Sequence, residues 1–261
     1  MAMKMLLLTA LLAAAPVQAM QCSARSANAT TALVELYTSE GCDSCPPADR
    51  WLSTLRAKGY APDRVVPIAL HVDYWDYIGW KDPYAKQAFS ARQRKMASLA
   101  RAAVVYTPQV LLQGRDFRSW REGGNPGAFE QEVAKINARP AKAQISLSLA
   151  ARSKEAFEVE AAAELLDALP SADVALYIGA YENKLVSEVK AGENRGRTLA
   201  HDFVVLQWAG PLEFQGRRLA ARQTLPLLPK AVPAHSGVVA FVQNRSTGEV
   251  LQALMLPACP P

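Results

Sequence analysis

Hydrophobic and polar positions follow two different periods along the chain. Between residues 31 and 138, apolar runs at 32–37 and 65–72 predict buried strands, and helical periodicity predicts helices at 49–58, 83–103 and 126–137. Strands that alternate with helices are the pattern of βαβ units. This part of the chain therefore predicts an α/β domain.

After residue 140 the apolar positions alternate with polar ones, which is the period of half-buried strands. Many short strands with few helices between them are typical of a β-sandwich. We therefore expect two domains, an α/β domain at 20–140 and an all-β, sandwich-like domain at 141–261. The candidate strands of the second domain lie at 145–149, 157–161, 174–178, 203–208, 238–243 and 250–254.

The first residues have the pattern of a secretory signal peptide. Lys4 supplies a positive charge, residues 5–15 are apolar, and small residues end the segment at Ala19. The apolar run is too short to span a bilayer. We expect cleavage after residue 19 and a mature, periplasmic or secreted protein without a membrane span. Cleavage removes one cation from a formal net charge of +5, and so mild a surplus predicts no nucleic-acid partner.

Four cysteines form two kinds of pair. Cys22 and Cys259 lie near opposite ends of the mature chain, and an even count in an oxidising compartment favours full pairing. We expect a structural disulfide between them. The alternative is that both lie on frayed ends, unpaired or bonded to another molecule.

The other two cysteines form a Cys42-Asp43-Ser44-Cys45 motif between a predicted strand and a predicted helix. A sulfur at a helix N-terminus is stabilised as thiolate by free N–H groups and the macrodipole. Cys42 would then attack a client disulfide, and Cys45 would resolve the mixed disulfide. Two alternatives stay open: a metal site in which Cys42, Cys45 and His71 bind copper or zinc, and an inert structural disulfide. No other cofactor is expected.

The order of these elements, with Thr107-Pro108 before a further strand, resembles the thioredoxin superfamily over about residues 31–138. Longer phrases are similar to an uncharacterised family of secreted, thioredoxin-like bacterial proteins, a domain of unknown function. They are VELYTSEGCDSCPPA at 34–48, HVDYWDYIGW at 71–80 and GENRGRTLAH at 192–201. The resemblance implies a thioredoxin-like α/β fold for the first domain and brings no established substrate.

The resemblance also implies roles for individual residues. Pro108 matches the superfamily's cis-proline, which lets backbone approach the cysteine pair and a client peptide; from the residues alone it would be a loop proline. Glu35 resembles the buried strand carboxylate that acts as general base for the second cysteine. An edge-facing, solvated Glu35 is the alternative.

Two polar and aromatic segments have no role in the motif itself. Tyr74 and Trp75, together with Thr107, are candidates for a client groove, because aromatic side chains near polar groups are common in binding sites. The favoured alternative is that Trp75 packs in the interior and that His71 is a hydrogen-bonded strand residue. The glycine-punctuated segment 192–197 predicts a turn between strands.

Together these observations predict an exported thiol–disulfide oxidoreductase. Its partners would be client proteins with thiols or disulfides and an unidentified redox partner that recycles the pair. The rival functions are a copper metallochaperone that uses the same cysteines and a non-enzymatic binding module with a structural disulfide. The sequence does not determine the direction of exchange, because direction depends on the reduction potential.

Overall fold

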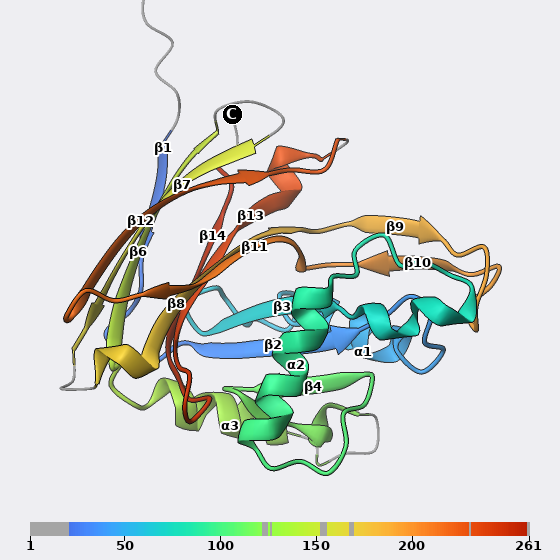
Figure 1. Cartoon of the computed structure of the whole chain (residues 1–261), viewed down its shortest axis with the longest axis horizontal. Coiled ribbons are helices and arrows are strands. Elements are labelled where there is room, and N and C mark those ends of the chain that lie inside the picture. Colours follow the sequence, from blue (N-terminus) through green and yellow to red (C-terminus); the bar gives the residue numbers. More distant parts are fainter. Residues whose placement is uncertain are drawn as a thin grey trace, which may run out of the picture.

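The structure is a computed structural model that describes residues 21–121, 125, 127–151, 156–166, 170–229 and 231–259. The predicted signal peptide, residues 1–19, lies outside the described residues. The described residues are mostly β, with 43% in strands and 20% in helices, and the strands form a large mixed sheet, a smaller antiparallel sheet and a two-stranded hairpin (Figure 1). None of the helices in the described ranges has the length and apolar character needed to span a bilayer.

The larger sheet has eight strands in the order β14-β13-β8-β11-β3-β2-β4-β5. Both halves of the chain contribute to it, and they meet where β3 runs parallel to β11, with Ala69 opposite Val204. From the first half come β2 (Ala32–Thr38), β3 (Val65–His71), β4 (Gln109–Leu112) and β5 (Arg115–Asp116). From the second half come β8 (Val174–Glu182), β11 (Val204–Glu213), β13 (Ser236–Asn244) and β14 (Val250–Pro257).

The predicted fold class, a thioredoxin-like α/β domain followed by an all-β sandwich-like domain, is wrong. The strands of the first half form no separate α/β sheet, because β3 pairs with β11 and the sheet extends through the strands of the second half. A strand edge carries unpaired N–H and C=O groups that need partners, and β11 supplies them for β3. Periodicity reports which faces of a strand are buried and not which strand lies beside it.

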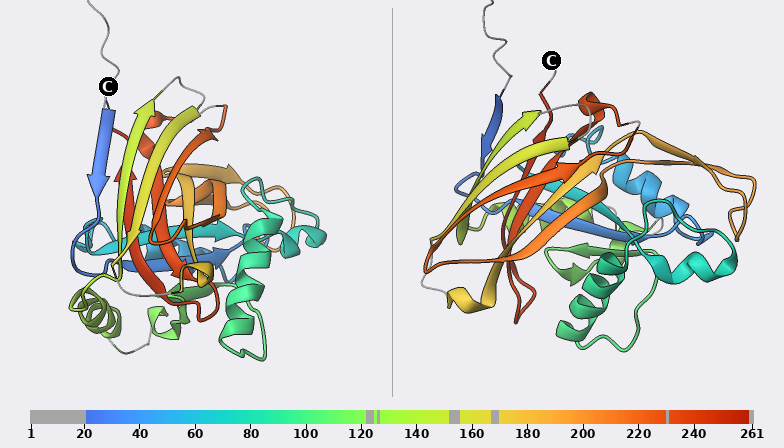
Figure 2. Two further views of the ribbon diagram at one scale, coloured as in Figure 1. Left: turned by 60° about the vertical axis from the view of Figure 1, so that its left-hand side comes forward. Right: turned by 45° about the horizontal axis from the view of Figure 1, so that its top comes forward.

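The smaller sheet has four antiparallel strands in the order β1-β6-β7-β12. Figures 1 and 2 show it lying across the β8–β13–β14 end of the larger sheet. Side chains such as Ile145, Phe157, Ile178 and Val238 fill the space between the two. Buried and more exposed positions alternate in β6 and β7, which confirms the predicted period of two, whereas β8 is buried at nearly every position. The strands are β1 (Gln21–Arg25), β6 (Ala143–Ala151), β7 (Ala156–Leu165) and β12 (Arg218–Pro226).

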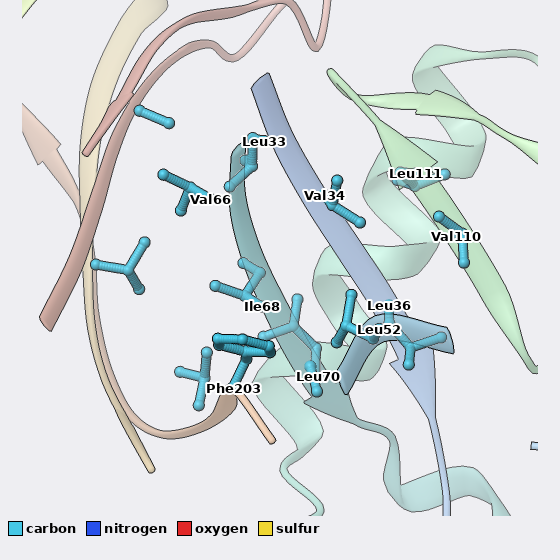
Figure 3. Close-up of a cluster of buried hydrophobic side chains, with 14 of the residues drawn as sticks. Leu33, Val34, Leu36, Leu52, Val66, Ile68, Leu70, Val110, Leu111 and Phe203 are labelled. Atoms are coloured by element: carbon cyan, nitrogen blue, oxygen red, sulfur yellow. The ribbon is translucent and has the colours of Figure 1, made fainter. Parts of the chain in front are cut away.

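A second core lies between the β2–β3 region and the helices. Every position of β2 and β3 is buried, as expected for strands covered on both faces. Leu52 from α1 packs here with Ile68 and Leu70, and Phe203 from the second half inserts among them (Figure 3). The helices are α1 (Pro46–Ser53), α2 (Gln87–Leu99) and α3 (Ala128–Asn137), with short 3-10 helices η1 (Asp73–Ile78), η2 (Arg118–Trp120), η3 (Ser171–Asp173) and η4 (Pro233–His235).

All four cysteines are paired. Cys22 in β1 is bonded to Cys259, with their Cα atoms 5.9 Å apart, and Cys42 is bonded to Cys45. The predicted terminal disulfide is therefore confirmed. Disulfides persist in oxidising compartments, so the pairing indicates an extracytoplasmic location.

Candidate functional site

The Cys42–Cys45 disulfide closes the loop that leads from β2 into α1, with a Cα–Cα distance of 5.4 Å. Cys45 is the N-cap residue, and Pro46 and Pro47 occupy the first helical positions, where the missing N–H of proline costs nothing. Both cysteines are fully buried. A reagent or client therefore needs a local movement of this loop to reach either sulfur.

Pro108 lies beside this disulfide. The Thr107–Pro108 peptide bond is cis, as the resemblance implied, and the Thr107 carbonyl oxygen is 3.9 Å from Cys42 Sγ. Ser44 Oγ lies 3.4 Å from the same sulfur. Tyr74 contacts the Thr107 hydroxyl and donates a hydrogen bond of 2.9 Å to Gln93 Oε1. Of the predicted client-groove residues, Thr107 lines the groove described next and Tyr74 does not.

A groove of about 1030 Å³ lies next to the cysteine motif and is lined there by Ser44, Thr107 and Pro108. It runs from Ser44 along α1 to η2 and α3, and Trp51 packs in it at 6.1 Å from the Trp120 ring centroid. Trp75 does not line it; its indole nitrogen is buried. Only the position of Trp51 on the motif's own helix could have signalled this groove. Its aromatic and charged lining residues are Trp51, Tyr60, Trp120 and Phe129, and Arg50, Lys58, Arg121 and Glu130.

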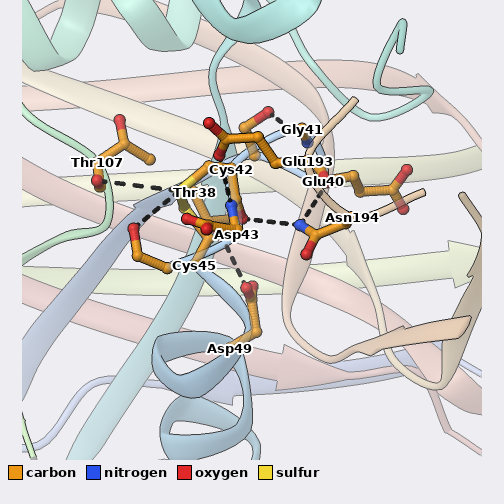
Figure 4. Close-up of a disulfide and its surroundings, with 12 residues drawn as sticks. Thr38, Glu40, Gly41, Cys42, Asp43, Cys45, Asp49, Thr107, Glu193 and Asn194 are labelled. Carbon is orange, nitrogen blue, oxygen red and sulfur yellow. Dashed lines mark hydrogen bonds between the residues drawn. A yellow bond between two sulfur atoms is a disulfide. The ribbon is translucent and has the colours of Figure 1, made fainter. Parts of the chain in front are cut away.

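The segment 192–197 forms the predicted turn, between β9 (Leu185–Glu188) and β10 (Thr198–His201), and also holds the cysteine loop. Asn194 is fully buried, and its Nδ2 donates hydrogen bonds of 2.8 Å to the carbonyl oxygens of Glu40 and Cys42 (Figure 4). The carboxylate of Glu193 accepts a hydrogen bond of 3.0 Å from the Asp43 backbone N–H. No local signal in the sequence pointed to this contact.

Glu35 is buried in β2, so the solvated alternative is wrong. Both its oxygens accept hydrogen bonds from Arg92, at 2.7 and 3.0 Å, and one also accepts the Tyr37 hydroxyl at 3.0 Å. Burial alone would lower the pKa of Arg92, but the Glu35 carboxylate raises it above its usual value. Among the described residues no contact joins Glu35 to either cysteine, and its carboxylate serves the ion pair.

A second cluster of buried polar side chains lies between α1, the end of β3 and the end of β10. His71 Nδ1 lies 2.7 Å from Asp82 Oδ2, and His201 Nε2 lies 3.2 Å from Glu40 Oε1. His201 Nδ1 lies 3.4 Å from Asp49 Oδ1. All five residues are at most 6% exposed. The interpretation of His71 as a hydrogen-bonded strand residue is confirmed, and its neighbours come from distant parts of the sequence.

Neighbouring charged groups shift the pKa values of two side chains in this cluster. Burial would raise the pKa of Asp82, but the nearby His71 and hydrogen bonds lower it below its usual value, so Asp82 is a carboxylate. Burial would likewise lower the pKa of His201, but Asp49 and Glu40 raise it to about 10. The cluster therefore favours positive charge between its carboxylates.

Comparisons with known proteins identify a family and a fold. A family model described as "Protein of unknown function (DUF1223)" matches residues 33–243. A crystal structure of an Agrobacterium tumefaciens protein is 24% identical, with a TM-score of 0.64 over 90% of this chain and 98% of the other. HBP35 of Porphyromonas gingivalis is 14% identical, also with a TM-score of 0.64, over 89% of this chain and 76% of the other. No curated protein matches the sequence.

Proposed function

Because the chain belongs to the family described as proteins of unknown function (DUF1223), its activity has to be argued from its own site, and we propose that it is an exported thiol–disulfide oxidoreductase. It would work in the periplasm or outside the cell and exchange disulfides with client proteins through Cys42 and Cys45. One observation carries the proposal: this disulfide opens a helix at the end of an aromatic, basic groove.

The exchange transfers two electrons between the protein and its client. In the reduced protein, the Cys42 thiolate attacks a client disulfide, forms a mixed disulfide and releases one client thiolate. The Cys45 thiolate then attacks the Cys42 sulfur, which restores the intramolecular disulfide and releases the second client thiolate. Client oxidation runs through the same steps in reverse. A separate redox partner would restore the starting form after either direction.

Two features reduce the stabilisation of a Cys42 thiolate at this helix. Pro46 and Pro47 remove two of the free N–H groups that a helix N-terminus normally offers to an anion. The exposed carboxylate of Asp43 lies next to Cys42 and repels negative charge. When the thiolate is poorly stabilised, the reduced form is less stable relative to the disulfide. These features therefore favour a weaker oxidant than a disulfide oxidoreductase whose reduced form is strongly stabilised.

The groove suggests what kind of client segment would bind. Aromatic rings contribute apolar contact area, and three cations outnumber the one carboxylate among its charged lining residues, Arg50, Lys58, Arg121 and Glu130. A segment with apolar and acidic side chains next to its cysteine would complement this lining. Thr107 and Ser44 would lie where that cysteine meets the disulfide.

The rival function is a binding module in which Cys42–Cys45 is a permanent structural disulfide. The complete burial of both sulfurs and the hydrogen bonds from Asn194 favour it. The two functions differ in the reduction potential, because structural disulfides resist reduction by glutathione.

The deciding measurement is the reduction potential of the purified mature protein, equilibrated in glutathione or dithiothreitol buffers with free thiols trapped and assigned by mass spectrometry. A reversible transition of the Cys42–Cys45 pair between about −120 and −270 mV would support exchange. A potential below about −300 mV would overturn the proposal in favour of the structural disulfide.

The groove is tested separately by the rate of exchange with a disulfide-bonded peptide that carries acidic and aromatic residues. Arg50→Glu and Trp120→Ala should slow this rate and leave the reduction potential unchanged. Arg222→Glu, an equivalent charge reversal on the exposed β12 strand, is the matched control. Equal rates in all variants would contradict the role of the groove.

A further inference from the structure

Two buried imidazole nitrogens of this cluster have no hydrogen bond among the described residues, although one of them, His201 Nδ1, lies 3.4 Å from Asp49 Oδ1. His71 Nε2 and His201 Nδ1 form no hydrogen bond with any described residue, although their side chains are 0% and 2% exposed. Buried polar groups are normally paired, and each exception calls for a physical explanation. One ring nitrogen of His71, one of His201 and a carboxylate oxygen of Asp49 all lie within 4.8 Å of one another.

The remaining polar atoms of the three side chains are already occupied. Asp82 contacts the other nitrogen of His71, Glu40 contacts the other nitrogen of His201, and the second oxygen of Asp49 accepts a hydrogen bond of 2.9 Å from Thr38. Histidines that bind metals nearly always donate their second N–H to a carboxylate or carbonyl, which fixes the tautomer and the ring. The outer contacts thus leave one inward-facing atom on each side chain.

We propose that Asp49, His71 and His201 form a binding site for a divalent transition-metal ion, with Zn²⁺ as the first ion to test. The site is independent of the proposed redox activity, because its donor atoms are two imidazole nitrogens and one carboxylate oxygen. Such a set suits Zn²⁺ and neighbouring divalent ions, whereas Cu⁺ prefers sulfur. It therefore differs from a copper site built on Cys42 and Cys45.

The distances between the ligand atoms fit an ion with tetrahedral coordination. Two ligands bonded to zinc at about 2.0–2.2 Å lie about 3.4 Å apart in a tetrahedron, which is the 3.4 Å between His201 Nδ1 and Asp49 Oδ1. All the ligand atoms lie within 4.8 Å of one another, so the separations that involve His71 need to shorten by at most about 1.4 Å to reach the same geometry. Three protein ligands leave a fourth position for water.

The buried carboxylates around the site also favour a divalent cation. Glu40, Asp49 and Asp82 are buried carboxylates, and in the described part of the chain no lysine or arginine forms an ion pair with them. Buried charges in proteins are paired or coordinate metals. A divalent cation between the imidazoles would offset two of the three negative charges, and a proton on His201 is the rival way to offset one.

The site would join three elements that are far apart in sequence. Asp49 comes from α1, His71 from the end of β3 and His201 from the end of β10. A bound ion would hold the helix that begins after Cys45 against the larger sheet and the β9–β10 hairpin. It would then stabilise the folded protein by binding the native state alone.

The test is metal binding by the oxidised mature protein, purified without a histidine tag and freed of metal with a chelator. Because the three ligands are buried, Zn²⁺ is added both to native protein and during refolding. Metal content is measured by mass spectrometry and affinity by competition with a zinc indicator. Co²⁺ replaces Zn²⁺ for absorption spectra, which report ligand type.

We expect one Zn²⁺ per chain in the wild type and in the Cys42→Ser/Cys45→Ser variant. His201→Gln should lose at least 100-fold in affinity, and the outer-contact variant Asp82→Asn should lose about 10–100-fold. His235→Gln removes the one histidine outside the cluster and should bind as the wild type does. Retention of zinc without the cysteines separates this site from the redox pair.

Three results would overturn the site. They are a wild type that holds no zinc under either loading, unchanged affinity in folded His201→Gln and Asp82→Asn variants, and a cobalt spectrum with thiolate charge-transfer bands. If His201→Gln fails to fold, the Asp82→Asn affinity and the wild-type cobalt spectrum decide alone. A redox potential typical of a structural disulfide would refute the proposed function and leave the metal site standing.

Discussion

The Asn194 side chain is expected to control access to the Cys42–Cys45 disulfide, and Asn194→Ala tests this directly. The substitution removes two hydrogen bonds that Asn194 donates to the backbone oxygens of Glu40 and Cys42. It also removes the oxygen that accepts a hydrogen bond from Arg197. At about 0.5–1.5 kcal/mol net for each hydrogen bond, the two backbone contacts together stabilise the closed loop by about 2 kcal/mol.

The expected consequence is faster reduction. Both sulfurs are fully buried, so dithiothreitol can attack only after the loop opens locally. If the open form lacks the Asn194 contacts, their loss favours opening by the same 2 kcal/mol, which corresponds to about 30-fold in population. When reclosing is faster than attack, the reduction rate follows that population and should also rise about 30-fold.

The assay follows reduction by dithiothreitol under native conditions, with samples quenched by a thiol-labelling reagent and the Cys42–Cys45 peptide quantified by mass spectrometry. Arg197→Ala is the matched control, since it removes a single hydrogen bond to the Asn194 oxygen and should change the rate by less than about 10-fold. The terminal disulfide serves as internal reference. A folded Asn194→Ala protein that reduces at the wild-type rate would refute this account of access.

Other contacts lead to further expected outcomes. Replacing Cys22 and Cys259 with serine opens a loop with a sequence separation of 237, and the loop-entropy model gives about 5 kcal/mol as the upper loss in unfolding free energy in urea; a loss under about 1 kcal/mol would contradict it. Glu35→Gln leaves a buried guanidinium without its carboxylate and should cost about 3–5 kcal/mol, with the reduction potential of the Cys42–Cys45 pair unchanged; a shifted potential would point back to the general-base role. Burial, and then the hydrogen bond to Asp116, raise the pKa of Tyr106 from its usual 10.0 to about 12. The stability contributed by its neutral phenol is therefore complete below about pH 10 and lost as pH rises towards 12. The ultraviolet titration curve of Tyr106→Phe is subtracted from that of the wild type. The difference should show a midpoint near pH 12, and a midpoint near pH 10 would rule this out.

Local signals predicted the elements of this protein well. The apolar runs at 32–37 and 65–72 lie in β2 and β3, and the alternating positions after residue 140 lie in antiparallel strands. The helix predicted at 49–58 is α1, which begins three residues earlier, at Pro46. These features depend on neighbours within a few residues, where backbone sterics and side-chain periodicity act.

The predicted fold class was wrong because the fold depends on pairing between strands that are far apart in the sequence. Val204 lies beside Ala69, and Phe203 fills the core of the first half, so the strands of the two halves form one sheet. An apolar strand has the same pattern whether its neighbour is close in sequence or more than a hundred residues away. The resemblance to a smaller α/β fold matched the local order of elements and missed their continuation.

The sequence by itself determined the elements that carry the Cys42–Cys45 motif and the even number of cysteines that allowed both disulfides. Only the tertiary structure decided what surrounds them. Asn194 reaches the cysteine loop, and His201 meets His71 and Asp49, across separations of more than 100 residues. Such contacts depend on how strands and helices pack in three dimensions, and a pattern that extends over a few residues contains no information about that packing.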